Sequence, residues 1–102
     1  MLEAAQKAFA RTEGLTLEEL RSNEDRVLAL VHLLEILGEA AKAVSAETKE
    51  AHPELPWAEM AATRDRLIHG YFSVDLDIVW QIARHDLPQV IEQIKLLVEE
   101  TG

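Results

Sequence analysis

Apolar side chains recur at three- and four-residue steps along most of the chain, which is the period of an amphipathic helix. The longest stripe comprises Val27, Leu30, Val31, Leu34, Leu37 and Ala41. A second stripe comprises Leu76, Val79, Trp80 and Ala83, and a third comprises Val90, Ile91, Ile94, Leu97 and Val98. No segment shows the alternation of a half-buried strand. The pattern therefore predicts an all-α fold.

Breakers and capping residues mark the boundaries in the first half of the chain. We expect a helix over residues 1–11, ended by Gly14. Thr16-Leu17-Glu18-Glu19 has the spacing of a capping box, so a short helix should begin after Thr16. Asn23 is a suitable N-cap for a long helix that reaches about Val44.

In the second half we expect a short helix over residues 46–51 and a connection over 52–56, where two prolines exclude regular helix. Residues 57–72 contain no proline and predict a further helix. Asp75 should cap the helix after it, and Pro88 should kink or restart that helix with Asp86 as a second cap.

Small residues between Gly38 and Ala41 keep one part of the long helix thin, which permits a close helix–helix approach. Four main helices with short connections favour an up-and-down bundle with one or two extra short helices. A chain of 102 residues has room for one core, so we expect a single domain over residues 1–102.

Two polar side chains interrupt the apolar face of the helix expected over residues 57–72. A step of about 100° per residue places Tyr71 about 20° from Arg64, in the middle of that face. A buried guanidinium is costly unless it is paired. Either a carboxylate neutralises Arg64, or this face opens onto a site or a partner.

Composition and charge narrow the classes of function. The chain has no cysteine, and no apolar run approaches the ~20 residues that span a bilayer. The first eleven residues do not resemble a signal peptide, so we expect a cytoplasmic protein without membrane contact. Nineteen acidic and ten basic residues give a net charge of −9, which argues against broad binding of nucleic acid. Three interpretations are compatible with this net charge. Nucleic acid could be contacted locally through Arg64 and Arg66, the acidic face could bind a basic protein partner, or the charge could only keep the protein soluble.

His69 is the clearest acid–base candidate, because an unperturbed imidazole titrates near pH ~6.5. Asp65 precedes it by four residues and could orient its ring on a helix. Arg64 is a fixed cation suited to a phosphate or a developing oxyanion. An arginine and a histidine can cleave RNA without a metal ion, although such side chains more often make structural hydrogen bonds. The histidines show no metal-ligand spacing and the glycines form no phosphate loop, so we expect neither metal nor cofactor.

A longer series of residues resembles a known family. Arg64, His69 and Tyr71 match the Arg-x4-His-x-Tyr signature of the HepT-like toxins of the HEPN superfamily. The flanking blocks that agree with the family, in the same order, are residues 38–42, 52–57, 69–75 and 86–88. Two features depart from it: Asp65 stands where many relatives have asparagine, and the first helix looks short.

The resemblance implies a HEPN helical bundle that forms a homodimer, with the two motifs facing each other across a cleft. It implies a metal-independent endoribonuclease, the toxin of a type VII toxin–antitoxin pair, in which Arg64 and His69 act on RNA. The implied antitoxin is an MntA-like minimal nucleotidyltransferase that adds AMP to Tyr71. The alternative is a non-catalytic helical adaptor, or substrate-binding subunit, of a nucleotidyltransferase. The net charge and Asp65 favour that alternative, because both are unfavourable to RNA.

Overall fold

The computed structural model describes residues 1–63, 68–69 and 73–101, and within them it confirms the all-α class. The elements are α1 (Leu2–Ala10), α2 (Leu17–Arg21), α3 (Glu24–Ala43), α4 (Ala46–Ala51), α5 (Trp57–Ala61), β1 (Ile68–His69), β2 (Ser73–Val74), α7 (Leu76–Gln81), the π-helical segment η1 (Ile82–Asp86) and α8 (Leu87–Thr101). The two strands have two residues each and pair only with each other.

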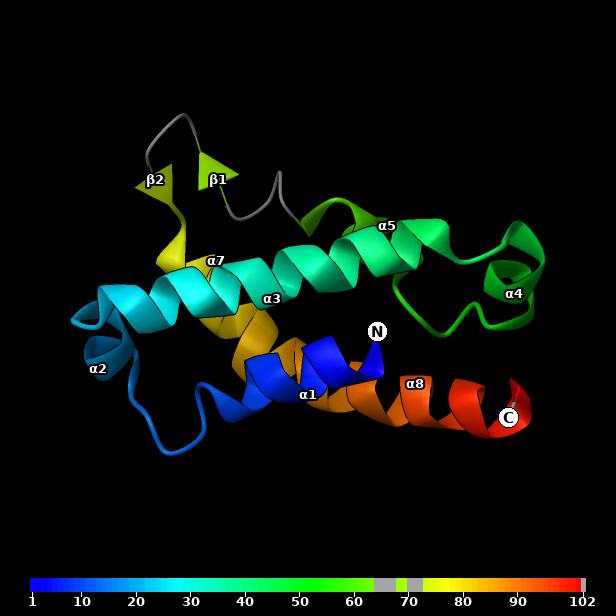
Figure 1. Ribbon diagram of the computed structural model, residues 1–102, viewed down its shortest axis with the longest axis horizontal. Helices are drawn as coiled ribbons and strands as arrows, with labels where there is room; N and C mark the ends of the chain where they lie inside the picture. The colour runs from blue at the N-terminus through cyan, green and yellow to red at the C-terminus, as the bar shows by residue number, and fades with distance from the viewer. Residues whose placement is uncertain (64–67, 70–72, 102) are drawn as a thin grey trace.

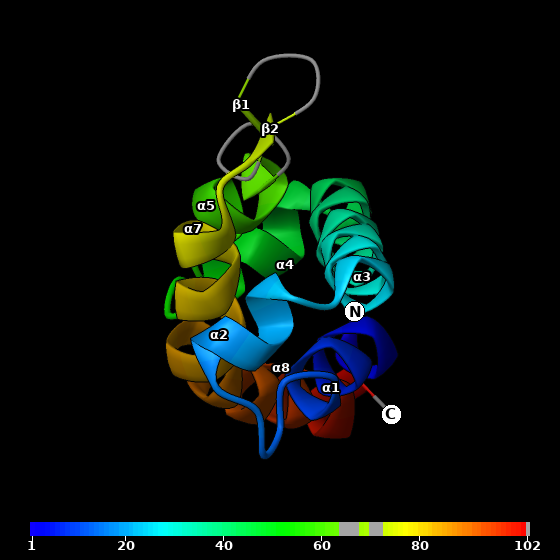
Figure 2. The same cartoon turned by 90° about the vertical axis from the view of Figure 1, so that its left-hand side faces the viewer.

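The long helix α3 runs along the molecule and contacts α1, α2, α5 and α7 (Figure 1). On one side it contacts α1, which in turn packs on α8. On the other side it contacts α5, and α7 and η1 lead from the strand pair to α8. The strand pair lies at the edge of the bundle opposite α1 and α8 (Figures 1 and 2).

The N-terminal caps lie where the sequence predicts them. The hydroxyl of Thr16 accepts from the backbone N–H of Glu19 at 3.1 Å, and the Glu19 carboxylate accepts from the backbone N–H of Thr16 at 3.2 Å. Asn23 accepts from the N–H of Arg26 at 3.0 Å at the start of α3. These side chains satisfy N–H groups that have no partner within the first helical turn.

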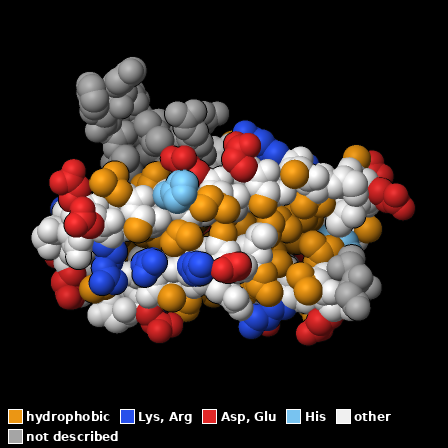
Figure 3. All heavy atoms as spheres, viewed as in Figure 1, with side chains coloured by type: hydrophobic (Ala, Val, Ile, Leu, Met, Phe, Trp, Pro, Cys, Tyr) orange, Lys and Arg blue, Asp and Glu red, His pale blue; other side chains and the backbone are white. Residues whose placement is uncertain are grey.

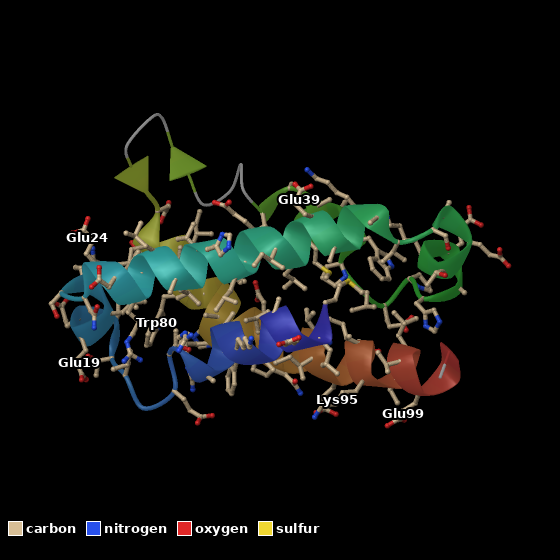
Figure 4. All side chains as sticks on the ribbon, in the orientation of Figure 1. Glu19, Glu24, Glu39, Trp80, Lys95 and Glu99 are labelled. Atoms are coloured by element: carbon tan, nitrogen blue, oxygen red, sulfur yellow. The ribbon has the colours of Figure 1, made fainter. Side chains whose placement is uncertain are left out.

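The predicted stripes form most of the core. In α3 the buried residues are Leu30, Val31, Leu34, Leu37, Gly38 and Ala41. In α8 they include Val90, Ile91, Ile94 and Leu97, whereas Val98 is 49% exposed and does not belong to the core. Trp57 and Trp80 are partly buried and pack against the core (Figure 4 labels Trp80). No helix in the described part of the chain combines the length and the apolar character needed to cross a membrane.

The boundary between α7 and α8 differs from the prediction. Asp86 is the last residue of η1 and does not begin a separate capped helix. The N–H of Leu87 donates to the carbonyl of Ile82, five residues earlier, and Leu87 keeps helical dihedral angles. Pro88 has no N–H to donate, so one α-helical bond is missing at this point in any case. A π-helical turn lets the chain pass this gap without breaking the helix.

Helices α3 and α5 approach each other closely at Gly38. A Cβ atom built on Gly38 would lie 2.6 Å from the backbone carbonyl oxygen of Met60. That distance is too short for carbon and oxygen that are not bonded, and the obstacle is backbone rather than a movable side chain. The small residue at this position is therefore a requirement of the packing, as the sequence suggested.

We predict that Gly38→Ala lowers the free energy of unfolding by about 1–3 kcal/mol, the usual cost of forcing extra volume into a packed interface. Helix propensity alone would favour alanine by about 1 kcal/mol, so the sign of the change identifies the packing contribution. The measurement is urea denaturation, with Ala29→Gly in the interior of α3 as the control for propensity. A Gly38→Ala variant more stable than the wild type would contradict the close approach.

Candidate functional site

The helix predicted over residues 57–72 is wrong in the part of this range that the structure describes, while residues 64–67 and 70–72 lie outside the described residues. α5 ends at Ala61, and His69 lies in the strand β1. β1 pairs antiparallel with β2, with Ile68 opposite Val74 and His69 opposite Ser73. Ile68 and Val74 are β-branched, which favours strands over helices. The helical pattern did not predict this pairing, because the pairing depends on hydrogen bonds between two short segments rather than on the residues of one segment.

Four of the predicted site residues, Arg64, Asp65, Arg66 and Tyr71, lie outside the described residues. For His69 the structure gives the backbone position in β1. Since the chain is not helical at His69, the helical step no longer relates Arg64 to Tyr71 or Asp65 to His69. A shared helical face therefore does not support the assignment of these residues, which depends on the sequence motif.

The segment before the motif is firmly attached to the bundle. Thr63 is buried, and its hydroxyl donates toward the carbonyls of Met60 at 2.7 Å and Glu59 at 3.2 Å. These carbonyls belong to the last turn of α5, where backbone acceptors lack helical partners. At the other end of α5 the indole N–H of Trp57 donates to the carbonyl of His52 at 2.9 Å. Thr63, the residue directly before Arg64 in the sequence, is therefore held in place by the bundle.

The segment after the motif is attached to α7. Asp75 accepts from the N–H of Ile78 at 3.2 Å, which confirms its predicted role as the N-cap. One helical turn begins there, and Asp77 in that turn pairs with Arg21 of α2 at 3.3 Å. Both partners of this ion pair are at least half exposed, so its contribution to stability is small. The motif is therefore bracketed by one buried attachment, at Thr63, and one capped helix.

Basic side chains gather elsewhere on the molecule, over α1 and the start of α3 (Figure 3). Arg26 donates to the backbone carbonyl of Arg11 at 2.9 Å, at the end of α1. The guanidinium of Arg84 lies 4.6 Å from the centre of the Phe9 ring and 3.3 Å from the hydroxyl of Thr12. These contacts tie α1 to α3 and η1, so Arg26 and Arg84 have structural roles.

A cavity of about 250 Å³ opens beside Thr63 and is lined by α3, α5, η1, α8 and the connection before α5. Its carboxylates come from Glu54, Glu59 and Asp86. The sequence predicts only a helix cap at Asp86 and no function for Glu54 or Glu59. The three carboxylates come from three separate segments, but Glu54 and Asp86 lie in two of the blocks that carry the family resemblance. Within the described ranges no group of three His, Asp or Glu side chains is arranged to hold a metal ion.

We predict that Thr63→Val lowers the free energy of unfolding by about 1–2 kcal/mol, because it removes a buried hydroxyl while keeping the shape of the side chain. The carbonyl of Met60 then loses its short hydrogen bond. Thr63→Ser retains the hydroxyl and is the matched control. Chemical denaturation of the three proteins measures the difference. A valine variant as stable as the wild type would contradict the contribution of this hydroxyl, and any loss in the serine variant measures the methyl group separately.

The family model and the individual relatives that match this chain all point to ribonucleases. The family model described as "Ribonuclease HepT-like" matches residues 1–97. A protein of Thermococcus cleftensis named probable ribonuclease HepT is 39% identical over 79 residues, which are 78% of this chain and 72% of that protein. A candidate RNase of Caldanaerobacter subterraneus is 33% identical over 100 residues, or 98% of this chain and 89% of that protein.

A candidate RNase of Methanocaldococcus jannaschii is 34% identical over 89 residues, which are 87% of this chain and 74% of that protein. No solved structure matches the chain. The helical architecture agrees with these matches. The chain belongs to the HepT-like ribonuclease family.

Proposed function

We propose that this protein is a metal-independent endoribonuclease and the toxin of a type VII, HepT/MntA-like toxin–antitoxin pair that acts in the cytoplasm. The observation that carries the proposal is the family match over residues 1–97, within which Arg64, His69 and Tyr71 keep the spacing of the family motif. The fixed segments at Thr63 and Asp75 support it, since a catalytic segment needs a rigid frame on both sides.

The chemistry assigned to the motif is attack of the 2′-oxygen of a ribose on the adjacent phosphorus. The bond from phosphorus to the 5′-oxygen of the next nucleotide breaks, and a 2′,3′-cyclic phosphate remains. His69 removes the 2′-hydroxyl proton or protonates the leaving 5′-oxygen, which are the two proton transfers that the reaction needs. Arg64 stabilises the extra negative charge on the phosphorane. Asp65 keeps a supporting role on the sequence motif alone, as a carboxylate that could orient the imidazole of His69, and Arg66 contacts the RNA backbone.

The proposed regulator is a minimal nucleotidyltransferase. The phenolic oxygen of Tyr71 attacks the α-phosphorus of ATP, pyrophosphate leaves, and the phenolic proton is released to a base. The product carries an AMP group, with its bulk and negative charge, two residues from His69 and seven from Arg64. That charge opposes the binding of RNA phosphates at the same place.

We further propose that two copies of the chain assemble, so that two motifs share one cleft. Leu28 and Ile36 on α3 are 56% and 43% exposed, and apolar side chains of this size on a helix surface are suited to contact with another subunit. An acidic chain with a net charge of −9 also suits a basic nucleotidyltransferase partner.

We predict that Arg64→Ala and His69→Ala each reduce the rate of RNA cleavage about 10²-fold or more, the usual contribution of a positioned acid–base group or charge. The measurement is cleavage of total RNA by purified protein in EDTA, together with growth of bacteria that express each variant. Asp65→Asn restores the residue common in the family and should retain cleavage. Equal RNA integrity and growth for wild type and both alanine variants would contradict the ribonuclease assignment.

Incubation with ATP and the cognate nucleotidyltransferase should increase the mass of the protein by whole AMP units. Intact-mass spectrometry measures this increase, and Tyr71→Phe, which lacks only the hydroxyl, should show none. The modified protein should also lose its cleavage of RNA. A stable complex without any change in mass would support the non-catalytic adaptor instead.

A further inference from the structure

Three arginine side chains from three separate elements reach the end of α1. Arg11 is the residue that ends this helix, Arg26 belongs to the first turn of α3, and Arg84 belongs to η1. Arg26 donates to the backbone carbonyl of Arg11 at 2.9 Å. Arg84 donates to the hydroxyl of the next residue, Thr12, at 3.3 Å. We call Arg11, Arg26 and Arg84 the arginine cluster, which lies at the edge of the bundle opposite β1 and β2 (Figures 1 and 2).

The arginine cluster has no carboxylate partner within the described part of the chain, although nineteen residues of the sequence are acidic. Four other described basic side chains each form an ion pair, namely Lys7, Arg21, Lys42 and Lys95. The acidic residues that lie nearest to the cluster in the sequence are Glu13, Glu24 and Asp25. They are exposed and form no ion pair with it. The positive charge of the cluster is therefore not neutralised by the described residues.

The end of a helix attracts cations in any case, because its last carbonyls carry partial negative charge. That explanation fits Arg26, which donates to a carbonyl. It does not fit the other two side chains, since Arg84 donates to a hydroxyl and the Arg11 guanidinium forms no hydrogen bond with a described residue. Moreover, the backbone N–H groups of Arg11 and Thr12 already donate to the carbonyls of Lys7 and Phe9. Helix termination therefore accounts for one arginine of the three.

The contacts of the cluster hold two guanidinium groups in place and leave most of their donors available. Each guanidinium has five N–H donors, of which Arg26 and Arg84 use one each in the contacts above. Arg84 also lies over the ring of Phe9, 4.6 Å from its centre. This stacking contact uses the face of the guanidinium and none of its N–H groups. Arg26 and Arg84 are half-buried and Arg11 is exposed, an arrangement that suits an anionic ligand with several oxygen acceptors.

We infer that the arginine cluster binds backbone phosphates of RNA, as a second contact at the edge opposite the strand pair that contains His69. The inference rests on the proposed function, which supplies RNA as the ligand. A guanidinium can donate two parallel hydrogen bonds to one phosphate, and contacts of this kind position a nucleic acid without reading its sequence. The net charge of −9 does not prevent such binding, because salt screens charges beyond about 8 Å at physiological ionic strength.

The test is fluorescence anisotropy of a labelled oligouridylate with the His69→Ala protein, which should bind RNA without cleaving it. A strand of about 20 nucleotides, at a stacked rise of about 3.4 Å each, is longer than the 41 Å length of the molecule. Arg11→Gln combined with Arg26→Gln in this parent should weaken binding at least about tenfold. Glutamine at position 26 keeps an N–H donor for the Arg11 carbonyl, and Arg84 is left unchanged because it packs on Phe9.

The matched control is Lys49→Gln combined with Lys95→Gln in the same parent, which changes the net charge equally. These lysines lie in α4 and α8, outside the cluster (Figure 4 labels Lys95), so this variant should bind RNA within about twofold of the parent. Salt dependence gives a second measurement. The slope of log binding constant against log salt concentration should become shallower by about 1.4 in the cluster variant, at about 0.7 for each lost phosphate contact.

Thermal denaturation without RNA shows whether both double variants are folded. Equal weakening in the two would show that RNA binding follows net charge, and would overturn the proposal. A parent that binds no RNA, or a cluster variant that binds as tightly as its parent, would also overturn it. In the last case, loss of modification by the nucleotidyltransferase would assign the cluster to an acidic protein partner. Cleavage by the protein with His69 intact is measured separately, so failure of the ribonuclease assignment is distinguished from failure of the cluster.

Discussion

The close approach of α3 and α5 at Gly38 is the constraint on which the rest of the structure depends. Because the Met60 carbonyl occupies the space of a side chain at Gly38, α5 lies directly on α3. This contact fixes Met60. It also fixes Thr63, because the hydroxyl of Thr63 donates a hydrogen bond to the same Met60 carbonyl. The buried face of α3 then packs with α1 on one side and with α5 on the other. One missing Cβ therefore positions both Thr63, the residue before the motif, and one wall of the cavity.

Features that depend on a few neighbouring residues were predicted well from the sequence. Hydrogen bonds within one helical turn explain the capping box at Thr16 and the caps at Asn23 and Asp75. The cap at Asn23 also marks the start of α3. The core stripes were also correct, apart from Val98, because burial follows helical period when a helix is regular. These features need no knowledge of where distant segments lie.

The candidate site was predicted less well by pattern alone. The absence of proline after Trp57 allowed a helix through residue 72, but α5 ends at Ala61 and His69 lies in β1. Helix and strand were close alternatives here, and the pairing of residues 68–69 with 73–74 decided between them. Strand pairing depends on both segments at once. The hydrophobic pattern of one segment therefore does not predict it. The family motif was informative because it names residues without requiring their secondary structure.

The π-helical segment shows how one local irregularity changes which residue faces the core. In a regular α-helix that continued from Val79, a step of about 100° per residue would place Asp86 about 20° from Val79, in the centre of the buried stripe. The bond from the Leu87 N–H to Ile82 adds one residue to the turn and shifts the later residues back by about 100°. Leu87 takes the central position and is 1% exposed, while Asp86 moves to the edge of the stripe and lines the cavity. A charged residue that would be costly in the core thus becomes part of a surface with a net negative charge, and Pro88, which forbids one helical bond, makes the shift inexpensive.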